Sequence, residues 1–319
     1  MNPLERFKRG PHAASDDDRA TVNLDDFPVT DDTYTGPMTV SDHPIGALIG
    51  CGGRSLTPEE IRTILEYQQQ RGIRFGEAAV ALSLATGDSV LRALSQQFRY
   101  AYSPDLLHGN DSSELVVAAT PFSDGAEAFR ELRSQLMIGP MNGQQQRRAL
   151  AVLSPDVGDG KTYVAANLAV AFSQLGGRTL LVDADMRTPR QHTVFHMEQP
   201  WGLSNVLSGR ARHNAIHHVK DLPSLYIMPV GAVPPNPLEL VQRPAFGIFL
   251  NELLSKFDYV LVDTPAASHG ADARVIAAKA GSALVVGRKG RSRMDSLQGL
   301  MKKLVAGSTA IAGVVMNEY

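Results

Sequence analysis

Six short apolar runs recur through the second half of the chain, and helical stretches separate most of them. They are ALAVLS at 149–154, RTLLVDAD at 178–185, LYIMPV around 226–230, DYVLVDTP at 258–265, ALVVGR at 283–288 and AIAGVVMN at 310–317. Runs of this kind, without polar alternation, indicate strands that are buried on both faces. The alternation of strands and helices predicts an α/β fold, with a mostly parallel sheet flanked by helices over residues 125–319.

The N-terminal part of the chain has a different pattern. Residues 1–42 are rich in Asp, Thr, Pro and Ser and hold few large apolar residues, which predicts a disordered acidic tail. Residues 43–105 carry helical periodicity and predict a small helical module. The segments 45–68 and 74–97 resemble each other, so we expect two related halves. Residues 106–124 are expected to be a linker.

A helix start within this module has a clear signature. Thr57 can act as the N-cap, Pro58 occupies the first helical position and Glu60 stands at the third. These residues predict a capping box, followed by a helix with an apolar stripe.

Composition narrows the class of protein. The chain has 31 basic and 33 acidic residues for a net charge of −2, so a nucleic-acid partner is not expected. The single cysteine, Cys51, excludes an internal disulfide, and a reducing compartment fits. No apolar run reaches the ~18 residues of a membrane span, and the N-terminus has no signal-peptide core. We therefore expect a cytoplasmic protein that meets the membrane only through a partner.

The strongest chemical motif is SPDVGDGKT, which follows one predicted strand and opens a helix. Gly158 and Gly160 let backbone N–H groups turn toward a phosphate at the positive helix end. Lys161 would contact the β- and γ-phosphates and the Thr162 hydroxyl would bind Mg²⁺. The common pattern has Gly where this chain has Pro155. The expected nucleotide-binding segment comprises Asp156, Val157, Gly158, Asp159, Gly160, Lys161, Thr162 and Tyr163.

Carboxylates follow two later strands. Asp183 and Asp185 leave the C-terminal edge of the sheet on the same side, because they are two residues apart on an extended segment. Such a pair can hold hydrated Mg²⁺ and accept a proton from a hydroxyl, although a turn or capping role is the alternative. Asp263 ends another strand, where P-loop proteins place a further Mg²⁺-organising carboxylate.

Together, SPDVGDGKT, LLVDADMR and VLVDTPA resemble the motifs of the bacterial tyrosine kinases (BY-kinases) of capsule and exopolysaccharide assembly. GLSNVLSG at 202–209 and GAVPPNPLELV at 231–241 agree, and the similarity covers residues 125–317. The greatest similarity is to EpsG-like chain-length-determinant kinases, in which a proline at the position of Pro155 is usual.

The resemblance implies ATP and Mg²⁺ as cofactors, with Lys161, Asp183 and Asp185 as catalytic residues and Asp263 holding Mg²⁺ through water. Which aspartate accepts the tyrosine proton stays open, and Arg187 has either a motif role or a salt-bridge role. The implied partner is the cytoplasmic tail of a membrane polysaccharide co-polymerase, which would place the chain at the inner membrane.

The segment EAFRELR puts Glu127, Arg130 and Arg133 on one helix face. A solvated charged face is the ordinary interpretation of such a pattern. The same pattern packs between ring subunits in BY-kinases, so we expect a homo-oligomeric ring.

Members of the family generally end in a tail of clustered tyrosines that neighbouring subunits phosphorylate. Here only Tyr319 follows the last predicted strand. So short an extension gives little reach, so we expect weak phosphorylation of Tyr319 or none, and a main substrate on another protein.

The module at 43–105 resembles the N-terminal domain of type II secretion ATPases, some of which bind cyclic di-GMP through a doubled motif. The second copy keeps Arg74, Gly76, Leu94 and Gln97, but the first has Pro44 in place of its arginine. Loss of that guanidinium removes a bidentate phosphate contact, so a protein-docking module is expected and cyclic di-GMP binding is the alternative.

Two other functions remain open. A regulatory ATPase switch of the MinD/ParA type usually carries an extra lysine in the P-loop, where this chain has Asp156. The other alternative is a degenerate kinase that acts only as an ATP-dependent scaffold.

Overall fold

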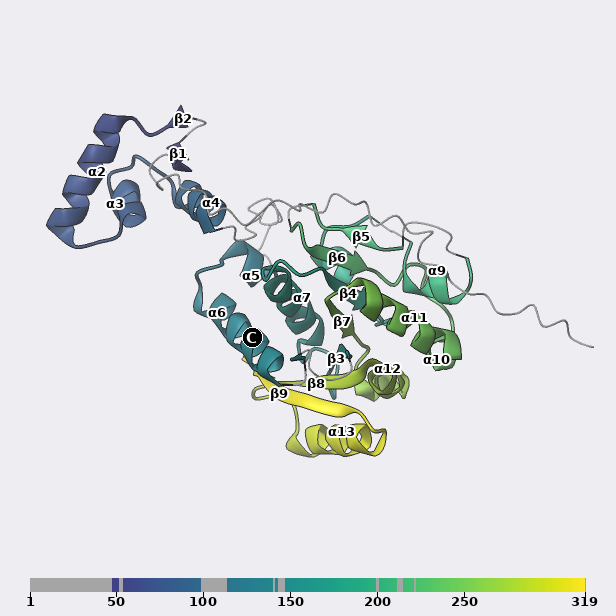
Figure 1. Ribbon diagram of the computed structural model, residues 1–319. Coiled ribbons are helices and arrows are strands. Elements are labelled where there is room, and N and C mark those ends of the chain that lie inside the picture. The colour runs from purple at the N-terminus through teal and green to yellow at the C-terminus, as the bar shows by residue number, and fades with distance from the viewer. Residues whose placement is uncertain are drawn as a thin grey trace, which may run out of the picture.

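The structure, a computed structural model, describes residues 48–51, 54–98, 114–139, 141–142, 147–198, 201–210, 215–220 and 222–318. A seven-stranded sheet of order β5-β6-β4-β7-β3-β8-β9 forms its centre (Figure 1). The strands are β3 Ala149–Leu153, β4 Thr179–Asp183, β5 His217–His218, β6 Leu225–Met228, β7 Tyr259–Asp263, β8 Gly281–Arg288 and β9 Ala310–Asn317.

Every one of the six predicted runs contains a strand, and these six strands are parallel. This confirms the predicted fold class. The two-residue strand β5 pairs antiparallel with β6 and was not predicted, because two histidines carry no strand pattern.

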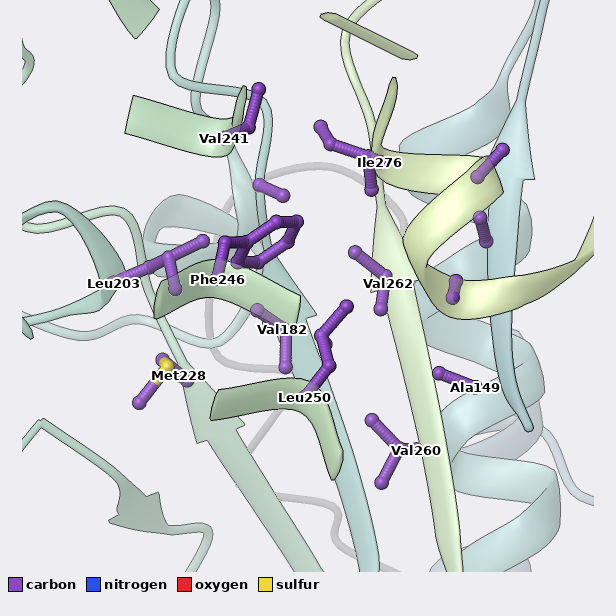
Figure 2. Close-up of a cluster of buried hydrophobic side chains, with 14 of the residues drawn as sticks. Ala149, Val182, Leu203, Met228, Val241, Phe246, Leu250, Val260, Val262 and Ile276 are labelled. Carbon is purple, nitrogen blue, oxygen red and sulfur yellow. The ribbon is translucent and has the colours of Figure 1, made fainter. Parts of the chain in front are cut away.

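One face of the sheet packs on helices from the second half of the domain. These are α9 Leu203–Leu207, α10 Pro237–Gln242, α11 Pro244–Lys256, α12 Asp272–Ala280 and α13 Met294–Ala306. Figure 2 shows Phe246 and Leu250 of α11 directed toward Val182, Val260 and Val262 of the strands. All five side chains are fully buried, so this layer forms a continuous apolar core.

The other face is covered by α7 Lys161–Ser173, with α5 Val116–Ala119 and α6 Asp124–Ile138 outside it (Figure 1). Nearly every residue of α7 is buried, which is expected of a helix enclosed on all sides. Strand β3 serves both cores, because Leu150 and Val152 face α7 whereas Ala149 and Leu153 face the opposite layer.

Helix α5 begins this domain earlier than predicted. Leu115 and Val117 are buried in the core beneath α7. The buried Asn167 of α7 holds them there, since its Oδ1 accepts a hydrogen bond from Val117 N at 3.1 Å and its Nδ2 donates to Glu114 O at 2.7 Å. The expected linker at 106–124 is therefore wrong for residues 114–124, where a four-residue helix was too short to give a periodic signal.

The N-terminal module contains α2 Pro58–Arg71, α3 Phe75–Ala81 and α4 Gly87–Phe98, with a hairpin of β1 Gly50–Cys51 and β2 Arg54–Ser55. Its own apolar cluster includes Ile49, Ile64 and Ala78. The predicted capping box is confirmed: Thr57 Oγ1 accepts a hydrogen bond from Glu60 N and the Glu60 carboxylate accepts one from Thr57 N.

The second half of the module consists of α3 followed by α4. Residues 45–47, where the first half begins, lie outside the described residues, so the similarity of the two halves stays a prediction. The predicted tail at 1–42, together with Pro44, lies outside the described residues. Among the helices that the structure describes, none combines the length and the apolar character needed to cross a bilayer.

We predict that Asn167→Ala lowers the free energy of unfolding by about 1–3 kcal/mol, because it leaves the buried Val117 N–H and Glu114 carbonyl without their partner. Denaturant titration measures this. Asn251→Ala, at an exposed position of α11, is the matched control. Equal stability of the two variants would contradict the role of Asn167.

Candidate active site

The predicted motifs meet at the C-terminal edge of three neighbouring strands. Strand β7 lies between β3 and β4, and the register places Val152 of β3 and Asp183 of β4 beside Asp263 of β7. The loop that follows β3 therefore lies next to both aspartates. This edge is where open parallel α/β sheets bind their ligands.

The loop has the backbone form of a phosphate-binding loop. Gly158 and Gly160 have φ angles of 85° and 95°, and α7 begins at the next residue, Lys161. A side chain at position 160 would place its Cβ 2.1 Å from Asn317 Nδ2, so this glycine is needed for close packing as well as for its dihedral angle. Backbone N–H groups and the start of a long helix together form an anion site.

Residues after β8 and at the end of β9 hold the loop in place. The buried Asp159 accepts hydrogen bonds from Asp156 N at 2.9 Å and from Ser292 Oγ at 2.8 Å. Asn317 Nδ2, at the end of β9, donates to the carbonyl of Asp159 at 3.2 Å. The loop is therefore fixed by contacts that do not depend on a ligand.

Lys161 joins the loop to the second motif. Its Nζ lies 3.0 Å from Asp185 Oδ2, and the residue is only 8% exposed. Burial works to lower the pKa of Lys161, but the charges of Asp263 and Asp185 raise it above its usual value. Burial likewise works to raise the pKa of Asp185, but Lys161 and hydrogen bonds from Thr188 lower it. Lys161 and Asp185 are therefore both charged.

Asp183 and Asp263 are buried carboxyls with a shared neighbour, Gln191 of α8 Gln191–Val194. Gln191 N donates to Asp183 Oδ2 at 3.1 Å, and Gln191 Nε2 donates to Asp263 Oδ2 at 2.9 Å. Burial and the charge of Asp263 raise the pKa of Asp183 well above its usual value. Burial, opposed by Lys161, raises the pKa of Asp263 to about 6.

The residues present fit a hydrated Mg²⁺ ion. Asp263 Oδ1 is buried without a hydrogen-bond partner, which is the state of an acceptor that awaits a cation or water. Thr162 acts on the same carboxyl, since its side chain works to lower the pKa of Asp263. Within the described residues, no three His, Cys, Asp or Glu side chains gather to hold a metal by themselves. Water and phosphate oxygens would therefore complete the coordination, as is usual for Mg²⁺.

Some predicted site residues have other contacts. The ring of Tyr163 packs on Phe129 of α6, with ring centroids 5.7 Å apart, so this side chain belongs to the core between the helices. Arg187 forms a bidentate ion pair with the buried Asp272 of α12 at 2.9–3.2 Å, which favours the salt-bridge alternative. Val157, at the tip of the loop, is 45% exposed.

The predicted interface residues contact their own chain. Arg130 pairs with Glu127 at 2.9 Å and also donates to the carbonyl of Pro121. Arg133 donates to the carbonyl of Ala171 on α7 at 2.6 Å. The Glu127 side chain is 73% exposed. Tyr319 lies outside the described residues.

Sequence reasoning missed three residues of the site. Gln191 bridges two aspartates but stands in a stretch without a motif, and Ser292 follows a strand in a polar loop. Asn317 ends an apolar run that was interpreted only as a strand. A polar side chain at the end of an apolar run was the available signal for Asn317.

Comparison with known proteins identifies the class. Residues 150–319 match the family described as the CobQ/CobB/MinD/ParA nucleotide binding domain, so the chain belongs to this family of nucleotide-binding proteins.

Named relatives show which members of this family the chain is similar to. The putative tyrosine-protein kinase CapB of Staphylococcus aureus is 32% identical over 65% of this chain and 90% of CapB. The putative tyrosine-protein kinase EpsB of Ralstonia solanacearum is 35% identical over 64% of this chain, which spans only 27% of EpsB. The kinase domain of the Escherichia coli tyrosine kinase ETK matches 66% of this chain and 83% of its own, with 28% identity and a TM-score of 0.60. The chain is thus a member of the ATP-dependent bacterial tyrosine-protein kinases.

We predict that Asp263→Asn stabilises the nucleotide-free protein at pH 8. A buried carboxyl whose pKa is raised to about 6 favours its protonated form in the folded state. Its ionisation therefore costs stability above pH 6, on the order of 3 kcal/mol. That cost shrinks as the pH falls from 6 toward the pKa of the unfolded state, near 4. The stabilities of the wild type and the variant should therefore become equal at low pH.

Thermal unfolding between pH 4.5 and pH 8 tests this prediction. Asp295→Asn, at an exposed position of α13, should give no comparable gain. A stabilisation by Asp263→Asn that does not change with pH would contradict the assignment.

Proposed function

We propose that this chain uses MgATP to phosphorylate tyrosines of other proteins. The observation that carries the proposal is the 3.0 Å contact between Lys161 and Asp185, because it joins the phosphate-binding loop to the carboxylates that would receive an acceptor hydroxyl. The kinase names of the relatives support this chemistry.

The roles of the residues follow from their contacts. Lys161 and the backbone N–H groups around Gly158 and Gly160 would hold the β- and γ-phosphates. Thr162 and Asp263 would hold Mg²⁺, directly or through water, and the ion would offset phosphate charge. Asp183, which accepts hydrogen bonds from the backbone of Asp185 and Gln191, fixes the turn after β4.

Asp185 is the proposed base. It is ionised beside Lys161, whose charge keeps its pKa low and its basicity weak. Lys161 would also pair with a bound phosphate, so Asp185 would lose part of this pairing and become more basic. The carboxylate then accepts the phenol proton more readily, while Thr188 Oγ1 holds it in position at 2.9 Å.

The regulatory-switch and scaffold alternatives lack an observation of this kind. Asp156, which stands where a switch ATPase carries its extra lysine, donates its backbone N–H to Asp159 within the loop. Both alternatives predict ATP turnover without phosphotyrosine, so the product of the reaction separates them from a kinase.

We further propose a membrane polysaccharide co-polymerase as partner, which would bind through its cytoplasmic tail and recruit the chain to the inner membrane. Together the two would regulate the length or export of an exopolysaccharide. The resemblance of SPDVGDGKT, LLVDADMR and VLVDTPA to the motifs of capsule and exopolysaccharide kinases supports this assignment. The N-terminal module would act in docking: a Cβ at Gly76 would lie 2.5 Å from Val90 Cγ1, so packing alone explains this motif glycine without cyclic di-GMP.

We predict that Glu127→Lys prevents assembly of the proposed ring. A heterologous contact between different surfaces of neighbouring subunits closes into a ring, and the exposed Glu127 would face the neighbour. Sedimentation velocity with MgATP should show an oligomer for the wild type and monomer for the variant. Asp295→Lys is the control. Arg130 and Arg133 are less suitable targets, because both also hold their own chain. A wild type that stays monomeric with nucleotide and partner tail would contradict the ring.

We predict that Lys161→Met reduces tyrosine phosphorylation by at least about 100-fold, because the terminal phosphates lose their cation. Phosphopeptide mass spectrometry after incubation with MgATP and the partner's tail measures the product. Lys302→Met, on the exposed side of α13, should behave as wild type. Cooperative thermal unfolding should show that the Met variant is folded.

The same experiment locates the acceptor. With Tyr319→Phe, most phosphotyrosine should persist on the partner protein. ATP hydrolysis without any phosphotyrosine would instead support the switch or the scaffold.

A further inference from the structure

A pocket of about 570 Å³ lies beside the proposed active site, at the C-terminal end of β6. Pro189 and His192 form one wall, Trp201 and Asn205 another, and the loop from Gly231 to Val233 closes it. Of the described residues that line the pocket, only His192 is titratable. The pocket is therefore apolar and almost free of charge, unlike the carboxylate cluster beside it.

The pocket lies next to that cluster along the edge of the sheet. Val182 of β4 pairs with Met228 of β6, so Asp183 lies level with Pro229, which lines the pocket. Pro189 directly follows Thr188, which hydrogen-bonds Asp185, and His192 directly follows Gln191. A molecule seated in the pocket can therefore reach the carboxylates without crossing another strand.

The nucleoside part of ATP would lie on the side of the phosphate-binding loop that faces away from the pocket. The phosphate-binding loop follows β3, the aspartates follow β7 and β4, and the pocket follows β6, in that spatial order. Lys161 points toward Asp185, so the terminal phosphate would face β4. The base then extends toward β8 and β9, where Arg288 and Asn317 border the loop. The pocket thus remains available to a second substrate.

Backbone contacts hold the pocket in shape. Leu203 N donates to Pro229 O at 2.8 Å, and Ser204 N donates to Val230 O at 2.9 Å. A Cβ at Gly202 would lie 2.0 Å from Pro229 O, so only glycine permits this approach. The stretches 202–209 and 231–241 of the sequence therefore meet to build a preformed pocket, as is common for substrate sites.

The rim indicates the chemistry of the occupant. Trp201 is 52% exposed and Val233 is 59% exposed, although both are large apolar side chains. An aromatic face next to an aliphatic side chain binds apolar groups, and tryptophan is enriched at such recognition sites.

We propose that this pocket binds the acceptor peptide of the kinase: an apolar side chain next to the acceptor tyrosine packs against Trp201 and Val233, while the phenol reaches Asp185. The inference rests on the proposed function and deepens it. In the reaction, the phenol proton passes to Asp185 and the phenol oxygen bonds to the γ-phosphorus. The bond from that phosphorus to the bridging oxygen breaks, and ADP leaves.

Trp201 provides a direct readout, because the chain has a single tryptophan. The probes are two short synthetic peptides with one tyrosine each, flanked by leucine in the first and by aspartate in the second. With the full chain and MgADP, the leucine peptide should shift Trp201 emission to the blue in a saturable way. The aspartate peptide should bind about tenfold more weakly, since it brings charge to an uncharged pocket.

Kinetics with a matched pair of variants provides the second readout. Val233→Asp should raise KM for the leucine peptide by about tenfold, while KM for ATP and the basal ATP hydrolysis stay unchanged. Val305→Asp on α13 is the control, because Val305 is 62% exposed and lies far along the sheet order. The selective rise in peptide KM would distinguish an acceptor subsite from a structural role.

Three results would contradict the proposals, and they differ from one another. An unchanged peptide KM in Val233→Asp, with no response of Trp201 to peptide, would overturn the acceptor subsite alone. A response of Trp201 to the nucleotide by itself would assign the pocket to the base instead. A wild type that hydrolyses ATP but phosphorylates no tyrosine would overturn the kinase function, and with it the acceptor role.

Discussion

The rest of the site depends on the positive charge of Lys161, which partly neutralises three buried carboxyls. Asp183, Asp185 and Asp263 are each without solvent exposure, and carboxylates so close together cannot all ionise unless cations offset them. Lys161 stabilises the ionised form of Asp185, whereas burial keeps the pKa of Asp183 high. The strand ends, Gln191 and Thr188 hold the carboxyls where this balance works.

The same charges would make nucleotide binding at this edge depend on a divalent cation. ATP brings further negative charge to a site that is already rich in carboxyls, so phosphate alone would be repelled. An ion near Thr162 and the unpaired Oδ1 of Asp263 would reverse this repulsion. It would also release Lys161 from Asp185, so binding and activation of the proposed base become one event.

The sequence predicted those parts of the molecule that rest on local rules. Strands buried on both faces have continuous apolar sequences, so β3, β4, β6, β7 and β8 were visible. The edge strand β9 was also predicted, but the expectation that it is buried on both faces is wrong, because Val314 and Met316 are exposed. A glycine-rich turn between a strand and a helix predicts a phosphate loop. The partners of that loop were not visible. Ser292 and Asn317 follow Asp159 by 133 and 158 residues, and only the assembled sheet brings them together. Helix α5 and strand β5 were not predicted, because they are too short to show a periodic pattern of apolar residues.

The contact between Asn317 and the phosphate loop also has a consequence for synthesis on the ribosome. The chain emerges from its N-terminus, at about 5–20 residues per second, so roughly 10–30 s separate the loop from the side chain that clamps it. During that interval β3 and α7 can already form, whereas Gly160 has no Asn317 to pack against. A nascent domain of this topology therefore acquires its nucleotide loop in finished form only when the last strand, β9, has joined the edge of the sheet.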